Sequence, residues 1–356
     1  MIEVYGRVLR FVADPTATDF DELAIAVFRH QYESCAPYRA FCDSRNVDVD
    51  AVEIWRQVPA VPILAFKWAE ISCGPPQRVF QSTGTTEGVD RRSRHSIPDL
   101  RLARAAAIGG MRRYLFPDVE RMDLVSLIPP VADRPDSSLA QMVAWAAESF
   151  GRDGITEAAA GGAPAFDSFC ESLRRSERDG APLAVLTTTG ALIHFLEYAR
   201  TRALVFRLPH GSRLMDTGGF KGSPRSMSRK GLLHAIWRVF AIPGYYAVNE
   251  YGMAELSSQY YDSVIRDRFD GRHRPRRLAS PPWVRTAIVD PDTRGFAPPG
   301  MPGLVCHFDL ANAGSAMAVL SEDIGVIDEH GLRLLGRAPR AESRGCSMNV
   351  AEWHVS

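Results

Sequence analysis

The feature that most limits the fold lies in residues 181–200, where an apolar run leads directly into a helical pattern. The run APLAVLTTTG is long and apolar enough for a buried strand, and ALIHFLEYAR carries apolar residues at helical spacing. The same order returns further on: strand-like ALVFRL is followed by RLMDTGG, a helical pattern near 228–240 and the strand-like GYYAVNEYG. Strands joined by helices pair in parallel, because the helix carries the chain back across the sheet. The sequence therefore predicts an α/β core.

The segments before this core predict helices. Asp19 opens Asp-Phe-Asp-Glu, which has the form of a capping box, and apolar residues at helical spacing follow it. We expect an N-terminal helical region over residues 1–79. Helical patterns around 99–115 and 138–150 flank the apolar run DLVSLIPP. We therefore expect αβ subdomains over residues 80–280.

The pattern changes from about residue 281. Short apolar runs, separated by Pro, Gly and Asn, predict antiparallel strands and hairpins; these runs are GLVCHFDL, AMAVL, IGVID and LRLLGR. We expect a β-rich subdomain over 281–340 and a C-terminal tail over 341–356. The Ala/Gly-rich stretch at 157–165 is expected to be a surface linker.

Composition excludes several classes of partner. Lys plus Arg and Asp plus Glu both number 42, so no overall field would attract nucleic acid or an anionic membrane. No apolar run reaches the roughly 18 residues that a membrane span needs, and no signal peptide is evident, so a cytoplasmic protein with a small-molecule substrate is expected. No cysteines form a Cys-x-x-Cys pair or have zinc-site spacing, and most are expected to be reduced and buried. The cysteines are Cys35, Cys42, Cys73, Cys170, Cys306 and Cys346.

The sharpest local motif is QSTGTTEG at residues 81–88, directly after the apolar Val79 and Phe80. Glycines let several backbone N–H groups point at one anion, and the hydroxyls add donors, which suits phosphate binding. The common Gly-Lys-Ser/Thr nucleotide loop is missing, so kinase and GTPase interpretations lose support. A ligand-free Ser/Thr/Gly turn explains this stretch equally well when it is taken alone.

Four further motifs lie where strands are predicted to end. DTGGFKG (216–222) and NEYGMAE (249–255) each follow a strand, and ligands of α/β sheets gather at the carboxyl ends of strands. Tyr251 could stack on a purine and Glu255 could hold the magnesium of ATP. In SEDIG, Asp323 is expected at a strand-to-turn point where it could accept both ribose hydroxyls, and a Gly-Arg pair ends LLGR. Each motif alone also fits a solvated turn or helix start; their order is more informative.

In that order, the motifs resemble the adenylate-forming superfamily of acyl-CoA ligases, peptide-synthetase adenylation domains and luciferases. RSRH after the loop, MDTGGFKG, NEYGMAELSSQYYD, FDLAN and LLGR followed by RGCS are more closely similar to the LuxE-type acyl-protein synthetases, over roughly residues 60–350. The resemblance implies the large N-terminal domain of that fold, with stacked αβ subdomains plus a distorted β-barrel. It also implies that the usual small C-terminal domain is lacking.

The resemblance also implies site residues. Those for ATP are Ser82, Thr83, Gly84, Thr85, Thr86, Asn249, Tyr251, Gly252 and Asp323, with Glu255 on Mg²⁺. Apart from the resemblance, we expect the αβ subdomains to bind the carboxylic acid beside ATP, and the residues expected at the acid are His194, Gly218, Gly219, Tyr246 and Met253. We expect the acid pocket between ALIHFLEYAR and GYYAVNEYG, and we expect His194 and His307, which lie within apolar runs, to be core or pocket-wall residues.

Two departures from the superfamily pattern affect the expected chemistry. The superfamily's C-terminal lysine has no counterpart, because the sequence stops nineteen residues after Arg337. Lys221, or Arg92 or Arg94 near the phosphate loop, could supply positive charge in its place, although Lys221 is as readily an exposed turn residue. The resemblance gives Arg337 a different catalytic part, in contact with ribose or phosphate. Glu87 stands where the superfamily usually has glycine, so its carboxylate is expected to point away from the phosphates.

The expected activity is ATP-dependent formation of an acyl-adenylate, with pyrophosphate release, followed by transfer of the acyl group to a thiol. In the LuxE-type family that thiol is a C-terminal cysteine, here Cys346, and a partner acyl reductase receives the acyl group. Alternatives are a ligase for coenzyme A or a carrier protein, and a nucleotide-binding module without turnover. Hydrolases are disfavoured, because neither a Gly-x-Ser-x-Gly nor a zinc-type His pair is present.

Overall fold

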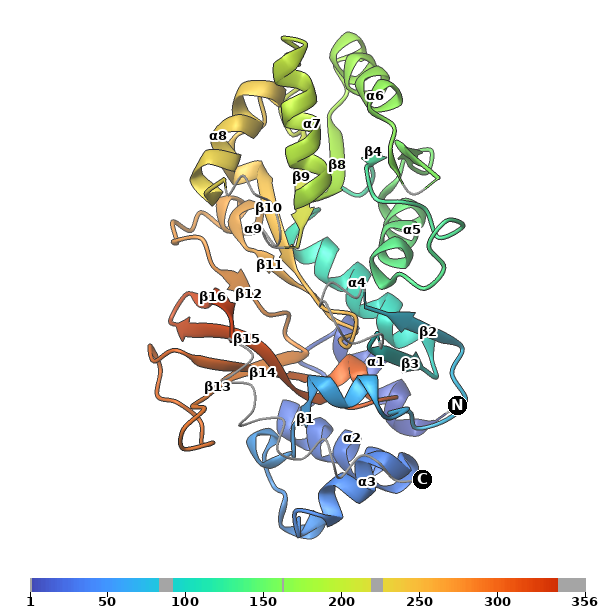
Figure 1. Ribbon diagram of the computed structural model, residues 1–356, viewed down its shortest axis with the longest axis vertical. Helices are drawn as coiled ribbons and strands as arrows, with labels where there is room; N and C mark the ends of the chain where they lie inside the picture. The colour runs from blue at the N-terminus through green and yellow to red at the C-terminus, as the bar shows by residue number, and fades with distance from the viewer. Residues whose placement is uncertain (1, 83–91, 162, 219–226, 339–356) are drawn as a thin grey trace. The chain divides into compact units, whose positions relative to one another are not determined.

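The computed structural model describes residues 2–82, 92–161, 163–218 and 227–338 (Figure 1). The chain forms two compact units, each built from separate stretches of sequence. The first unit comprises Met1–Gly109, Met253–Gln259 and Ala279–Ser356, and the second comprises Gly110–Gly252 and Tyr260–Leu278. The subdomains expected from the sequence, with boundaries at 79/80 and 280/281, are each one continuous stretch, whereas each of the two units combines separate stretches of the chain.

A mainly parallel sheet forms the second unit. Its strands run in the order β11-β10-β9-β8-β4-β5. All neighbours pair in parallel except β11, which is antiparallel to β10. The strands are β4 (Asp123–Ser126), β5 (Thr156–Glu157), β8 (Leu183–Thr188), β9 (Arg213–Thr217), β10 (Ala247–Tyr251) and β11 (Tyr260–Asp262). The predicted α/β core is confirmed.

Helices connect these strands and pack on the sheet. They are α5 (Ser138–Phe150), α6 (Phe166–Asp179), α7 (Thr189–Thr201), α8 (Arg229–Phe240), the 3₁₀ turn η4 (Gly244–Tyr246) and α9 (Val264–Phe269). Thr188 caps α7 by accepting from Ala191 N at 3.1 Å, so the strand-to-helix transition is fixed by one hydroxyl. Helices α7 and α8 pack together, with the rings of Phe195 and Phe240 stacked at 5.6 Å (Figure 1).

Two predictions in this unit were wrong. The segment ALVFRL is not a strand: Phe206 N and Leu208 N donate to the carbonyls of Val239 and Phe240 at the end of α8, at 2.7 and 3.2 Å. Its apolar alternation reflects packing of a connecting segment, and β9 (RLMDT) is the strand beside β8. The Ala/Gly-rich stretch forms a short hairpin, β6 (Ala159–Ala160) with β7 (Ala163–Pro164), rather than a linker.

The first unit begins with the predicted helices, α1 (Glu3–Ala13), α2 (Phe20–Ser34) and α3 (Ala36–Asp43). Asp19 caps α2 by accepting from Asp21 N and Glu22 N, at 2.8 and 3.2 Å. The Glu22 side chain binds Arg7 and Thr18. The 3₁₀ turns η1 (Val49–Ala51), η2 (Trp55–Gln57) and η3 (Ile63–Lys67) follow, and α4 (Leu100–Tyr114) runs from the first unit into the second.

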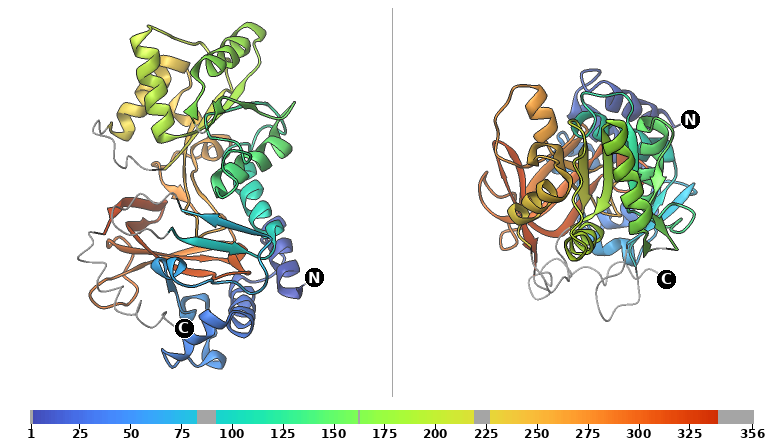
Figure 2. Two further views of the ribbon diagram at one scale, coloured as in Figure 1. Left: turned by 45° about the vertical axis from the view of Figure 1, so that its right-hand side comes forward. Right: turned by 90° about the horizontal axis from the view of Figure 1, so that it is seen from above.

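Antiparallel strands complete the first unit, as the sequence predicts. β13 (Val284–Val289), β14 (Gly303–Asp309), β15 (Ala318–Asp328) and β16 (Gly331–Arg337) pair in order, η5 (Leu310–Asn312) follows β14, and β1 (Val61–Pro62) pairs in parallel with β15. A separate hairpin joins β2 (Arg78–Gln81) to β3 (Arg94–Ile97), and β12 (Leu278–Ala279) lies at the boundary between the units. Figure 2 shows these strands in two further views.

Two further sequence predictions concern the described residues as a whole. The five cysteines among them are free, and Cys35, Cys42, Cys73 and Cys306 are buried, as predicted. Among the helices described, none combines the length and apolar character needed to cross a membrane.

Candidate functional site

Glu255 is a buried carboxylate in the irregular segment Met253–Gln259 of the first unit, and only 4% of the residue is exposed. Burial raises the pKa of this carboxyl, while a hydrogen bond from Ser93 and the positive charges of Arg337 and Lys67 act in the opposite direction. The cationic groups would attract phosphate, and carboxylate oxygens are ligands that Mg²⁺ accepts, so Glu255 is suited to face a metal that arrives bound to phosphate.

Ser93 also binds Ser82, the first residue of the STGTTEG motif. Ser82 N donates to Ser93 O and Ser93 N donates to Ser82 Oγ, both at 3.1 Å, which extends the β2–β3 pairing by one residue pair. Residues 83–91, which carry most of the STGTTEG motif, lie outside the described residues. The Glu255 carboxylate lies beside the paired residues Ser82 and Ser93, since Ser93 binds both Ser82 and Glu255.

His95 lies two residues beyond Ser93 on the same face of β3. Its Nδ1 lies 2.8 Å from the carbonyl of Ala254, and burial lowers the pKa of His95 to about 4, so the ring is neutral and Nδ1–H donates. Its Nε2 is buried and has no hydrogen-bond partner among the described residues. The motif RSRH was noted for its arginines, yet Arg92 and Arg94 are exposed and Ser93 and His95 face inward. Strand alternation after the loop was the signal that could have identified these two residues.

Asp323 and Arg337 face each other across β15 and β16. They are Cα partners in the ladder, and Arg337 Nε lies 3.1 Å from Asp323 Oδ1. The expectation that Asp323 stands at a strand-to-turn point is wrong. AMAVL and IGVID form one continuous strand, which absorbs the irregularity as a bulge between Ile324 and Gly325.

A second polar cluster lies in the second unit, where β9 and β10 end side by side. Asp216 accepts from Arg229 Nη1 at 2.6 Å, from Thr189 Oγ1 at 2.9 Å and from Asn249 Nδ2 at 3.2 Å. The amide nitrogen of Asn249 is therefore occupied within the protein, and its expected adenine contact stays a prediction. The carboxyl of Glu250 accepts from Thr217, and burial raises its pKa to about 7.

The other expected residues of this unit lie in different environments. Tyr251 ends β10 with its ring 5.7 Å from that of Tyr260, and Gly252 is exposed beyond it. Gly218 is exposed with φ +87°, a conformation that favours glycine. Tyr246 is 2% exposed.

The predicted core position of one of the two histidines is wrong. His194 is exposed, because α7 turns Leu192, Phe195 and Leu196 inward instead. His307 is fully buried in β14, as predicted. In the first unit, Met253 is half-buried. Contact of His194, Tyr246 and Met253 with a substrate stays a prediction.

Several expected site residues lie outside the described residues. They are Thr83, Gly84, Thr85, Thr86, Glu87, Gly219, Lys221 and Cys346.

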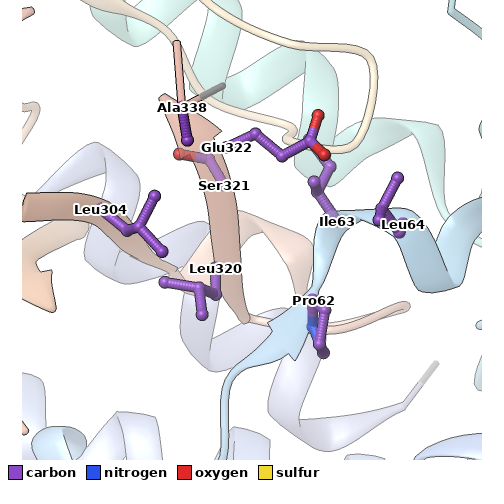
Figure 3. A pocket seen from close by; sticks show the side chains of 8 residues that line it. All are labelled: Pro62, Ile63, Leu64, Leu304, Leu320, Ser321, Glu322 and Ala338. Carbon is purple, nitrogen blue, oxygen red and sulfur yellow. The ribbon is translucent and has the colours of Figure 1, made fainter. Parts of the chain in front are cut away.

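A small apolar pocket in the first unit has none of the expected residues in its lining. Figure 3 shows its lining, which comes from η3 and from β1, β14 and β15; the residues are Pro62, Ile63, Leu64, Leu304, Leu320, Ser321, Glu322 and Ala338. Its walls offer few polar groups that could fix a nucleotide. Within the described part of the chain, no three His, Cys, Asp or Glu side chains gather to hold a metal ion. A metal at Glu255 would therefore need further ligands from phosphate oxygens, which is the usual arrangement for Mg²⁺ bound with a nucleotide.

The chain is similar to known proteins over most of its length. The family model of the acyl-protein synthetase LuxE matches residues 6–354. A long-chain-fatty-acid–luciferin-component ligase of Vibrio harveyi is 21% identical over 354 residues, covering 93% of this chain and 86% of that protein. A protein of the same name from Photorhabdus luminescens is 31% identical over 87 residues, which are 22% of this chain and 74% of that protein.

Solved structures show the same fold. An open conformation of 2-hydroxyisobutyryl-CoA ligase, in complex with its acyl-AMP and CoA, has a TM-score of 0.63 at 16% identity, covering 89% of this chain and 69% of that one. A long-chain-fatty-acid-CoA ligase from Archaeoglobus fulgidus has a TM-score of 0.51 at 12% identity, covering 77% and 53%. The model thus matches the N-terminal domains of adenylate-forming ligases. From residue 6 to residue 354, the chain belongs to the LuxE family of acyl-protein synthetases, and it is an adenylate-forming ligase.

Proposed function

We propose that this protein uses ATP to convert a carboxylic acid into an acyl-adenylate, with release of pyrophosphate, and then transfers the acyl group to a thiol. The observation that carries the proposal is the contact of Ser93 with both Ser82 and Glu255. It joins a buried carboxylate to the base of the STGTTEG loop, in a chain of the acyl-protein synthetase family.

The nucleotide roles are assigned residue by residue. Ser82 and the loop residues Thr83–Thr86 bind the phosphates, Tyr251 packs on adenine, with Asn249 and Gly252 beside it, and Asp323 accepts the ribose hydroxyls. Glu255 would hold Mg²⁺, which neutralises phosphate charge when it is bound. Arg337, which pairs with Asp323, contacts ribose or phosphate.

The chemical step is an in-line displacement. A carboxylate oxygen of the acid forms a bond to the α-phosphorus while the bond to the pyrophosphate oxygen breaks, so both electrons of that bond leave with pyrophosphate. The protein accelerates the step by holding acid and ATP together and by placing positive charge where negative charge develops. We assign that charge to Lys221, with Arg92 and Arg94 as alternatives.

The acid and the thiol are assigned by analogy. The names of the Vibrio and Photorhabdus relatives favour a long-chain fatty acid, and the family favours an acyl-protein thioester on Cys346, from which an acyl reductase takes the acyl group. Gly218, Gly219, His194, Tyr246 and Met253 are the residues we assign to the acid. Coenzyme A is the competing acceptor, because the ligase of known structure binds it.

Glu255→Ala tests the adenylation half. Acid-dependent ATP–pyrophosphate exchange should fall at least about 100-fold, since loss of one charged contact to the reacting phosphates commonly costs this much. Glu329→Ala, which removes a glutamate that is 84% exposed in the same unit, serves as the control and should exchange normally. If Glu255→Ala showed near-normal ATP–pyrophosphate exchange, the assignment of Glu255 to Mg-ATP would be wrong.

Cys346→Ser tests the acceptor. After incubation with ATP and a radiolabelled fatty acid, the wild-type protein should carry a thiol-labile acyl label, whereas the serine variant should carry none and still release pyrophosphate. If coenzyme A is acylated and the protein is not, the ligase for coenzyme A is correct instead.

A further inference from the structure

The segment Met253–Gln259, which carries Glu255, is buried without belonging to any strand of the first unit. Its backbone N–H and C=O groups must find partners, because an unpaired buried polar group is costly. Besides His95, which binds the carbonyl of Ala254, the partners include two side chains of the FDLAN sequence at the end of β14, Asp309 and Asn312, which lie more than fifty residues further along the chain. Neither residue has a role in the proposed function.

Asn312 binds the segment on both sides of Leu256. Its Nδ2 donates to the carbonyl of Glu255 at 2.9 Å, and its Oδ1 accepts from Ser257 N at 2.9 Å and from Ser257 Oγ at 2.6 Å. A carbonyl of residue i and an N–H of residue i+2 are the two groups that a residue of a neighbouring parallel strand would bind. The side-chain amide therefore replaces a missing strand and fixes the peptide on each side of Leu256.

The amide itself is held in one orientation. Its second Nδ2 hydrogen bond goes to the carbonyl of Ala316 at 3.1 Å, so both amide N–H groups are used. The backbone carbonyl of Asn312 accepts from Gln31 Nε2 of α2 at 2.9 Å. Asn312 is 1% exposed, so water cannot substitute for these bonds.

Asp309 fixes the residues that follow. Its carboxylate accepts from Ser257 N at 3.1 Å, from Ser258 N at 2.8 Å and from Ser258 Oγ at 2.7 Å. Trp283 Nε1 donates to the same Ser258 hydroxyl at 3.0 Å. The backbone from Glu255 to Ser258 is thus held by side chains from a single turn.

We propose that Asn312, supported by Asp309, is the positioning residue that sets where the Glu255 carboxylate stands for Mg-ATP. The inference rests on the proposed function, since it takes Glu255 as the residue that faces the metal and phosphates. Ser93 fixes the carboxylate end of Glu255 and Asn312 fixes its backbone end, so both ends of the side chain are defined by contacts from elsewhere in the fold.

A double-mutant cycle on Mg-ATP affinity tests this, with dissociation constants measured by calorimetry on the full-length protein. Asn312→Asp keeps the shape and the Oδ1 acceptor but places an oxygen against the Glu255 carbonyl. It should weaken Mg-ATP binding by about 10-fold or more, as loss of a supporting contact around a metal ligand commonly does. In a Glu255→Gln background the same substitution should change affinity less than about twofold, because the carboxylate that it positions is gone.

Two further variants keep the test decisive. Ser257→Ala removes only one hydrogen bond to Asn312 and should weaken Mg-ATP binding by a smaller factor. This variant takes the place of Asn312→Asp in the test if Asn312→Asp does not fold. Tyr38→Phe is the matched control: it removes one buried hydrogen bond of the same unit, from Tyr38 Oη to the carbonyl of Pro59 at 2.9 Å, and should leave Mg-ATP affinity unchanged.

An equal loss of affinity in the wild-type and Glu255→Gln backgrounds would overturn the inference, as would a Tyr38→Phe variant that weakens binding as much as Asn312→Asp. Failure of the proposed function is distinguishable, because a wild-type protein that binds Mg-ATP without acid-dependent pyrophosphate exchange would contradict the proposed function alone, and one that binds no Mg-ATP would contradict the nucleotide assignment.

Discussion

Glu250 is a glutamate held in the interior at the end of β10, 4% exposed, where Thr217 donates to its carboxyl. Burial raises its pKa from 4.5 to about 7, and the charge of Asp216 acts in the same direction. The folded protein therefore holds a proton on this carboxyl between about pH 4.5 and pH 7, where an unfolded chain has already released it. Folding stability from this group is greatest at low pH and falls as the pH rises through that window.

Glu250→Gln should remove this pH dependence. The amide stays neutral and its oxygen still accepts from Thr217, so the variant should gain stability relative to the wild type as the pH rises from 5 to 8, by up to about 3 kcal/mol. Urea unfolding at several pH values measures the difference. Parallel curves for the two proteins would show that the carboxyl is ionised at all these pH values.

At the scale of elements, β15 and β16 present Asp323 and Arg337 as a cross-strand pair. The Asp323 side chain is 13% exposed and that of Arg337 46% exposed, so the pair is partly solvated and contributes at most about 1 kcal/mol to stability. Because the pair contributes so little to stability, the effect of losing its proposed role in binding ribose can be measured separately from the effect of losing its structural role.

Asp323→Asn should therefore lower ATP–pyrophosphate exchange by about 10-fold or more while changing the free energy of unfolding by less than about 1 kcal/mol. Arg333→Gln, at an exposed position of the same strand as Arg337, is the control and should have normal activity. If activity fell only as much as the loss of stability explains, Asp323 would have a structural role in the β15–β16 hairpin and no role in binding ribose.

The sequence predicted the elements well where local pattern determines them. Apolar strands that enter capped helices were identified at β8 and α7, and the cap at Asp19 was confirmed. ALVFRL was mistaken for a strand because an alternating apolar pattern also arises in a connecting segment that packs on a helix end. Asp323 was placed at a turn because the polar residues between AMAVL and IGVID look like a break, whereas a bulged strand tolerates them.

At the scale of the whole molecule, the family and the order of motifs were readable from the sequence, but the contacts that build the site were not. FDLAN was recognised as a motif, yet nothing local reveals that Asn312 binds the carbonyl of Glu255. Likewise, RSRH showed four polar residues, and only the fold shows that Ser93 and His95 face the segment around Glu255. Such contacts join residues that are far apart in the sequence, and the periodicity of apolar residues along the chain does not predict them.

The hydrogen bond from Gln31 to the carbonyl of Asn312 joins residues that are 281 positions apart. During synthesis, helix α2 leaves the ribosome long before β14 and η5 exist, so it can pack on α1 and α3 early, whereas its contacts with η5 form only after residue 312 has been made. The second unit lies almost entirely within residues 110–278 and can assemble meanwhile. Nascent chains halted before residue 303 would therefore hold α1 to α3 and the second unit, but would lack β14 and η5 and with them the hydrogen bond from Gln31 to Asn312.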